Sequence, residues 1–186
     1  MTFRALLVVL FSIILILPGA AGERSGDGRD KHGHNKQSHG AHEHGAANLS
    51  VLVDGRTLEI EMRAPGANIV GFEHAAESDT DRAAVTKALK VLREDASIFA
   101  PANAAKCKIS EAHAQFGKDT YGKANVSHRE FEMRRVYTCK APDKLNHVHI
   151  GLFRKFTSLK EVDAAVVGPK EQHWQELTPH DSRLRL

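Results

Sequence analysis

Residues 47–62 of the chain read ANLSVLVDGRTLEIEM. Apolar and polar side chains alternate on both sides of Asp54-Gly55, a dipeptide that is typical of tight hairpin turns. Because successive side chains of a strand point to opposite faces, one face of this hairpin is apolar and the other is solvated. The stretch therefore predicts a β-hairpin whose apolar face must be covered by the rest of the chain.

A helix is predicted next, at about residues 79–95. Ser78 or Asp79 can cap its N-terminus, and Asp81 lies in its first turn. Apolar residues recur at helical spacing through the segment, namely Ala84, Val85, Ala88, Leu89, Leu92 and Ala96. We expect this helix to pack on the apolar face of the hairpin.

The remaining segments read mostly as strands, at residues 106–112, 129–140, 145–153, 162–167 and 171–177. Gly168-Pro169 is expected to turn the last two against each other, and Gln115–Asn125 to form a loop. Strands with one main helix on one face make an α+β domain built on an antiparallel sheet. We expect a single such domain at residues 46–186.

The first 22 residues have the pattern of a secretory signal peptide. Arg4 precedes an apolar run at residues 5–17, and small residues follow it. This run is shorter than the roughly 20 residues that a membrane span needs. The sequence therefore predicts an exported protein that keeps no membrane anchor after cleavage.

Residues 23–45 form a polar arm that should be disordered, because Ala41 is its only apolar side chain before Gly45. The arm holds five of the chain's twelve histidines, namely His32, His34, His39, His42 and His44. Neutral imidazole is a common ligand for zinc, nickel and copper, and pairs spaced by one residue can share an ion. A passive tail or a cloning tag is the alternative. The interrupted spacing and the position between leader and domain favour metal binding.

The net charge of the chain indicates which kinds of partner it is unsuited to bind. The full chain carries a net charge of +3, which falls to +2 without Arg4, so neither nucleic acid nor an anionic membrane is expected as the main partner.

The chain has two cysteines, Cys107 and Cys139. In an oxidising compartment such a pair normally forms a disulfide, and a pair of thiolate zinc ligands is the competing interpretation.

Several segments together resemble a family of histidine-rich, zinc-regulated zinc-binding proteins of the Gram-negative periplasm. These segments are His42–Gly45, Pro65–His74, the two cysteines, Val167–Lys170, Leu177–Pro179 and Arg183-Leu184. The resemblance implies zinc binding and a role in zinc acquisition, without a reaction. Family members often carry a second histidine-rich insertion between the cysteines. This chain has only the short Gln115–Asn125 segment there, which leaves the N-terminal arm as the main predicted site.

His74, His147 and His149 are secondary candidates for metal ligands within the domain. His74 belongs to the segment that carries the resemblance, and His147 and His149 share one face of a predicted strand. The function that we expect is a periplasmic accessory protein that captures zinc and passes it to the binding protein of a zinc ABC importer. The alternative is a buffer or detoxification protein for zinc, nickel or copper. A hydrolase is not expected, because no His-Glu-x-x-His sequence occurs.

Overall fold

The computed structural model describes residues 45–118, 128–169 and 171–186. The predicted signal peptide and almost all of the predicted arm therefore lie outside the described residues. The elements along the chain are β1 (Ala46–Asp54), β2 (Thr57–Pro65), α1 (Gly66–Val70), α2 (Asp79–Glu94), β3 (Phe99–Pro101), β4 (Cys107–Lys118), β5 (Arg129–Cys139), β6 (His147–Ile150), α3 (Leu152–Lys155), β7 (Glu161–Val167), β8 (Gln172–Leu177) and β9 (Arg183–Arg185). Among the described residues, no helix is long and apolar enough to cross a membrane.

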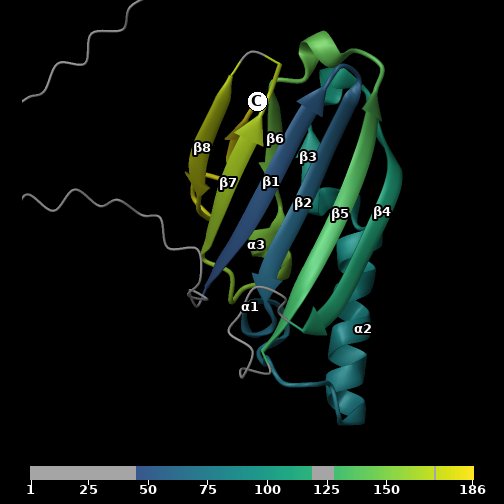
Figure 1. The fold of residues 1–186 in the computed structure, drawn as a ribbon, viewed down its shortest axis with the longest axis vertical. Coiled ribbons are helices and arrows are strands. Elements are labelled where there is room, and N and C mark those ends of the chain that lie inside the picture. The colour runs from purple at the N-terminus through teal and green to yellow at the C-terminus, as the bar shows by residue number, and fades with distance from the viewer. Residues whose placement is uncertain (1–44, 119–127, 170) are drawn as a thin grey trace, which may run out of the picture. The chain divides into compact units, whose positions relative to one another are not determined.

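The predicted hairpin is confirmed as β1 and β2. Its register pairs Leu49 with Met62 and Val51 with Ile60, and all four side chains are buried. Gly55 adopts a positive φ of 53° in the turn, which is a conformation that favours glycine. The two strands form the centre of a six-stranded sheet in the order β4-β5-β2-β1-β7-β8 (Figure 1).

This sheet is mixed, so the prediction of an antiparallel sheet is wrong at one pair of strands. β1 and β7 run parallel, with Leu49 beside Ala164. Parallel neighbours need a long crossover connection. Here the chain passes through β3, β6 and α3 before it returns as β7 beside β1.

The predicted helix is confirmed as α2. Ser78 caps it in a capping box, accepting a hydrogen bond from the Asp81 N–H while the Asp81 carboxylate accepts one from the Ser78 N–H. Val85, Ala88 and Leu92 are its buried residues. In Figure 1 the helix lies behind the sheet, and its main sheet contacts are with β4 and β5 rather than with the hairpin. The buried side chains of β1 and β2 belong to one apolar core with those of α2 and of the second sheet, which is described next.

A second, three-stranded sheet in the order β3-β6-β9 was not predicted. Its outer strands have only three residues each, which is too short for a periodic pattern to be recognised. The predicted strand at 145–153 spans only His147–Ile150. The next residue, Gly151, lies so close to the carbonyl of Ser97 that a Cβ would lie 2.1 Å from its oxygen. The chain then turns into α3. Residues of both sheets and of α2 form one apolar core.

A buried arginine joins the two layers. Arg135 is fully buried on β5 and donates hydrogen bonds to the carbonyl groups of Leu92 at 3.0 and 2.8 Å and of Asp95 at 2.9 Å. Its guanidinium also lies 5.8 Å from the centre of the Phe99 ring. The last carbonyls of a helix have no hydrogen-bond partner within the helix. Arg135 supplies the missing donors at the C-terminal end of α2 from its position on the sheet.

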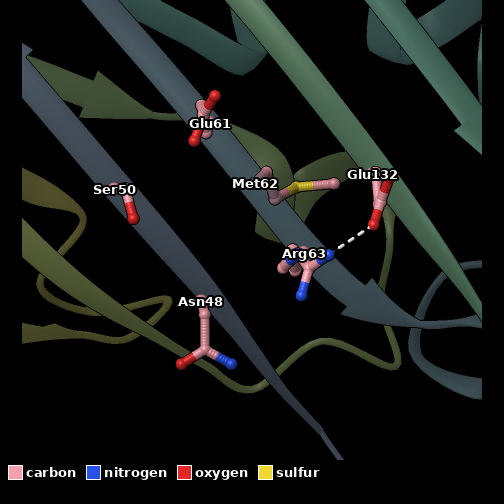
Figure 2. Close-up of a pocket in the computed structure, with 6 residues that line it drawn as sticks. All are labelled: Asn48, Ser50, Glu61, Met62, Arg63 and Glu132. Atoms are coloured by element: carbon pink, nitrogen blue, oxygen red, sulfur yellow. Dashed lines mark hydrogen bonds and ion pairs between the residues drawn. The ribbon is translucent and has the colours of Figure 1, made fainter. Parts of the chain in front are cut away.

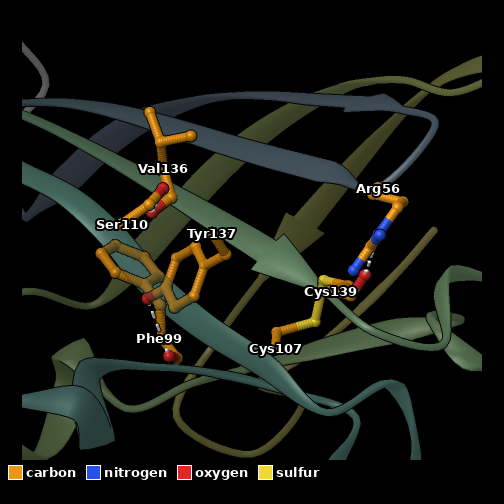
Figure 3. The surroundings of a disulfide bond; sticks show 7 residues. All are labelled: Arg56, Phe99, Cys107, Ser110, Val136, Tyr137 and Cys139. Atoms are coloured by element: carbon orange, nitrogen blue, oxygen red, sulfur yellow. Dashed lines mark hydrogen bonds between the residues drawn. A yellow bond between two sulfur atoms is a disulfide. The ribbon is translucent and has the colours of Figure 1, made fainter.

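β4 runs to Lys118, six residues beyond the predicted end at Ala112, since Ala114 is buried and Phe116 packs on Phe131. The predicted disulfide is confirmed between Cys107 and Cys139, which face each other across β4 and β5 (Figure 3). Because both sulfurs are bonded to each other, neither offers a thiolate to zinc.

Candidate metal centre at the root of the histidine-rich arm

The arm joins the domain at Gly45, and this junction is buried and hydrogen-bonded. The Gly45 N–H donates to Oδ1 of Asn68 at 2.8 Å, and the Gly45 carbonyl accepts from the N–H groups of Lys160 at 2.7 Å and Glu161 at 3.0 Å. Gly45 has a φ of +93°, which strains any residue with a Cβ. The predicted ligands His32, His34, His39, His42 and His44 all precede Gly45 and lie outside the described residues.

The side chain of Asn68 hydrogen-bonds to both residues of this junction, Gly45 and Ala46. It is 2% exposed within the short helix α1, and its Nδ2 donates to the Ala46 carbonyl at 2.7 Å. The helix ends at Gly71, which has a φ of 89° and donates its N–H to the Ala67 carbonyl. The segment after β2 therefore folds back to hold the first residues of β1.

Three carboxylates gather beside the same junction. Glu161 and Asp163 lie two residues apart on β7, and Asp163 pairs with Glu176 on β8. One carboxylate oxygen from each of the three lies within 4.8 Å of the others. The parallel register places Glu161 beside Ala46, one residue after the junction. This group could not be recognised from the sequence, because only the pairing of β7 with β8 brings Glu176 to the other two.

A depression on the same sheet begins at Asn48, which pairs with Asp163. Figure 2 shows its lining, which consists of Asn48, Ser50, Glu61, Met62, Arg63 and Glu132. The Arg63 guanidinium pairs with the Glu132 carboxylate at 2.5 Å and lies 3.6 Å from Glu130. A cation already occupies this position as a side chain, so we do not place a metal there.

His74 is exposed after α1, and its ring is held on two sides. Nδ1 lies 2.8 Å from the Ala75 carbonyl oxygen, and the ring stacks on Phe72 with centroids 4.6 Å apart. A hydrogen bond from one ring nitrogen to a carbonyl is common for histidines that bind metal through the other nitrogen. His74 thus keeps the geometry of a ligand, and its predicted role stays a prediction.

His147 and His149 lie on one side of β6, as predicted, with Val148 buried on the other. Their surroundings are basic, because Nη2 of Arg183 lies 3.1 Å from Nδ1 of His147. The pKa of His147 is lowered, first by desolvation and then by the charges of Arg183 and His149. A lowered pKa keeps the imidazole neutral, but the nearby guanidinium repels a metal cation. Their predicted role as ligands also stays a prediction.

One further histidine, His128, faces a carboxylate of the segment that follows α1. Nδ1 of His128 lies 2.9 Å from Oε2 of Glu73, with 44% of the His128 side chain and 17% of the Glu73 side chain exposed. The Arg129 N–H donates to the Glu73 carbonyl at 2.8 Å, which fixes the two backbones beside each other. Glu73 and His128 are far apart in the chain, so their contact could not be recognised from the sequence.

Comparison with known proteins identifies the family. No curated protein sequence matches the chain. The sequence profile of the family described as "ZrgA family zinc uptake protein" matches residues 41–186, from Ala41 to the C-terminus. The match includes His42 and His44 of the arm and every described element of the domain. The chain therefore belongs to the ZrgA family of zinc uptake proteins.

Proposed function

We propose that the protein is a periplasmic accessory protein that captures zinc through its histidine-rich arm and supports high-affinity zinc uptake. The predicted ligands are His32, His34, His39, His42 and His44. The signal-peptide pattern of residues 1–22 supports export, and the disulfide of the domain suits an oxidising compartment.

The observation that carries this proposal is the buried junction at Gly45. Four hydrogen bonds hold Gly45 and Ala46 between α1 and the start of β7. His44 is covalently bonded to Gly45, so the arm is attached to the domain at a residue whose own backbone is held by hydrogen bonds. The matched family region starts just before this pair.

The chemistry of the arm suits transfer rather than permanent storage. Imidazoles on a short polar segment bind zinc one or two at a time, so an ion can be passed on by replacing one ligand after another. The binding protein of a zinc ABC importer is the acceptor that we propose. Imidazole also binds nickel and copper, but the family name supports zinc.

The second candidate function is a periplasmic buffer or detoxification protein. Its supporting observation is the number of histidines in the arm, which suits a high capacity. Regulation separates the two functions, because scarcity of zinc should induce an uptake protein and excess should induce a buffer. We propose no catalytic role, since a catalytic zinc needs three fixed ligands and a nearby general base.

The experiment that tests the proposal is growth under zinc limitation. A strain that lacks the gene is complemented with the wild-type chain or with the His39→Ala, His42→Ala, His44→Ala triple variant, and cellular zinc is measured. The wild type should restore growth and zinc content, and the triple variant should restore less at equal protein level. Full restoration by the triple variant would contradict capture through the arm. Rescue seen only under zinc excess would favour the buffer.

A further inference from the structure

The outward face of the six-stranded sheet carries an apolar patch at its β8 edge. Leu52 on β1 pairs with Val167 on β7, and Trp174 on β8 pairs with Ala165 on β7. Val167 is thus the diagonal neighbour of Trp174, within reach of its indole. Leu52, Val167 and Trp174 are 43%, 40% and 64% exposed. The described residues expose one other large apolar side chain, Ile109, so these three are gathered in one place, the Trp174 patch.

The Trp174 patch lies on a face that no described element covers. In Figure 1 the strands β8, β7, β1 and β2 lie in front, and α2 and the strands of the second sheet lie behind them. Single exposed apolar residues are ordinary, but contiguous ones mark interaction sites. Tryptophan is also enriched among the residues that supply most of the binding energy of protein interfaces. The patch therefore has the character of a docking surface.

The polar part of this face is acidic. On β1, β2, β7 and β8, the outward charged side chains of the described residues are six carboxylates and one guanidinium. The carboxylates belong to Asp54, Glu59, Glu61, Glu161, Asp163 and Glu176. The guanidinium is that of Arg63, which pairs with Glu132 of β5 at 2.5 Å. Since the full chain has a net charge of +3, negative charge is concentrated on this face.

These properties narrow the kind of partner. Negative charge repels nucleic acid and an anionic bilayer. A second copy that docks with the same face would set carboxylates against carboxylates. The arm has Ala41 as its only apolar side chain before Gly45, so it cannot fill the Trp174 patch. The partner that fits is a different protein, whose surface carries lysine and arginine side chains around an apolar recess for the indole.

The same face begins where the arm joins the domain. Glu161 pairs with Ala46, the residue after Gly45. Leu52 lies six residues farther along β1, about 20 Å away at 3.3 Å per residue. A partner seated on this face would lie beside the attachment point of the arm. Holding two proteins together in this way raises their effective concentration, so an ion passes between them more readily.

We propose that the outward face of β1, β7 and β8 is the surface on which the protein that accepts zinc docks. Leu52, Val167 and Trp174 make its apolar contacts, and the surrounding carboxylates make its charged contacts. This inference rests on the proposed function for the identity of the partner, which is the binding protein of the zinc importer. It adds a place of contact to that function and needs no metal ligand in the domain.

The test is a binding titration by biolayer interferometry. The full mature chain is titrated with the purified, zinc-free binding protein of the zinc importer from the same organism. Trp174→Ser should raise the dissociation constant by about tenfold or more, because the indole supplies much of the binding energy. The matched control is Ile109→Ser, which changes an exposed apolar residue on β4, at the opposite edge of the sheet. The control should bind like wild type.

The acidic part of the face is tested with a Glu61→Gln, Glu176→Gln double variant. It should associate about threefold more slowly at low salt, and the difference should shrink at about 0.5 M salt, because salt screens the attraction. The charge-matched control is Glu77→Gln, Glu94→Gln, which removes two exposed carboxylates outside this face. This control should associate like wild type.

A second measurement covers the case that a variant fails to fold. Trp174 is the only tryptophan of the chain, so 5-fluorotryptophan gives a single ¹⁹F NMR signal without any substitution. This signal should shift when the binding protein is added. No binding, an unchanged signal in the complex, or wild-type affinity of Trp174→Ser would overturn the inference. A dimer of the chain alone that Trp174→Ser abolishes in light scattering would assign the face to a second copy and overturn it as well.

The outcomes also separate this inference from the proposed function. If Trp174→Ser binds like wild type while growth under zinc limitation still needs the arm, the docking face is wrong and arm capture stands. If Trp174→Ser loses binding while the arm triple variant restores growth like wild type, the docking face stands and arm capture is wrong.

Discussion

Asn68 accepts a hydrogen bond from the Gly45 N–H at 2.8 Å, and this contact fixes the point where the arm leaves the domain. Because Asn68 is 2% exposed, Asn68→Ala should leave buried backbone groups of Gly45 and Ala46 without partners. We expect a loss of about 2 to 3 kcal/mol in the free energy of unfolding, measured by urea denaturation in chelator. Asn48→Ala on the exposed face is the control and should cost less than about 0.5 kcal/mol. If both variants lowered the free energy of unfolding by a similar small amount, Asn68 would not hold the junction.

Arg135 and Arg134 are neighbours on β5 that point to opposite faces, so they form a matched pair. Arg135→Met should lower the free energy of unfolding by about 3 kcal/mol or more, because the carbonyls of Leu92 and Asp95 lose the guanidinium that donates to them. Arg134→Met removes a partly exposed ion pair with Glu59 and should lower the free energy of unfolding much less, because solvent screens this pair. Urea denaturation of both variants measures the difference. The account of α2 would be wrong if the two variants were equally stable.

The disulfide is expected to be complete in the exported protein. A thiol assay of denatured, unreduced mature protein should find no reactive thiol, because Cys107 and Cys139 are bonded. Their sequence separation is 32 residues, so a Cys107→Ala, Cys139→Ala double variant should be less stable by about 3 to 4 kcal/mol on the chain-entropy model. Two reactive thiols per chain would contradict the structure at this site.

The pKa of His147 should lie below 6.5 in the folded protein and can be measured by NMR titration. Desolvation is the largest cause and the charge of Arg183 the next, so Arg183→Gln should raise this pKa only part of the way. Arg185→Gln is the control and should change it little. Since the folded pKa is lower than the unfolded one, this histidine stabilises the fold above the unfolded pKa. That contribution is lost as the pH falls through the folded value. A His147 pKa above 6.5 would contradict this description.

The hairpin and α2 could be predicted because their signals are local. Alternation around Asp54-Gly55 and the capping box at Ser78 each depend on a few neighbouring residues. The parallel pairing of β1 with β7 could not be predicted, because it depends on the path of the chain through a second layer. The end of β6 at Ile150 could not be predicted either, since the close approach of the next residue, Gly151, to Ser97 exists only in the folded chain.

The candidate site also combines residues that can be recognised in the sequence with contacts that only the fold creates. The histidines of the arm were recognised from composition alone, and their role stays a prediction. The Glu161, Asp163 and Glu176 group and the Glu73–His128 contact required strand register and loop folding, which join residues distant in sequence. Arg135 was the least expected residue. Strict alternation on β5 places it on the same face as Met133 and Tyr137, but a charge rarely occupies such a position without a partner.

The central claim is that the arm supplies most of the zinc binding, and calorimetric titration at neutral pH tests it most directly. The mature wild-type chain is compared with the His39→Ala, His42→Ala, His44→Ala variant, and a His113→Ala, His180→Ala variant serves as control for two exposed histidines of the domain. The account predicts that the arm variant binds fewer zinc ions or binds them at least about tenfold more weakly. Its melting temperature in chelator should stay unchanged, since no described core residue belongs to the arm. An arm variant that binds the same number of zinc ions with the same affinity as wild type would contradict the claim.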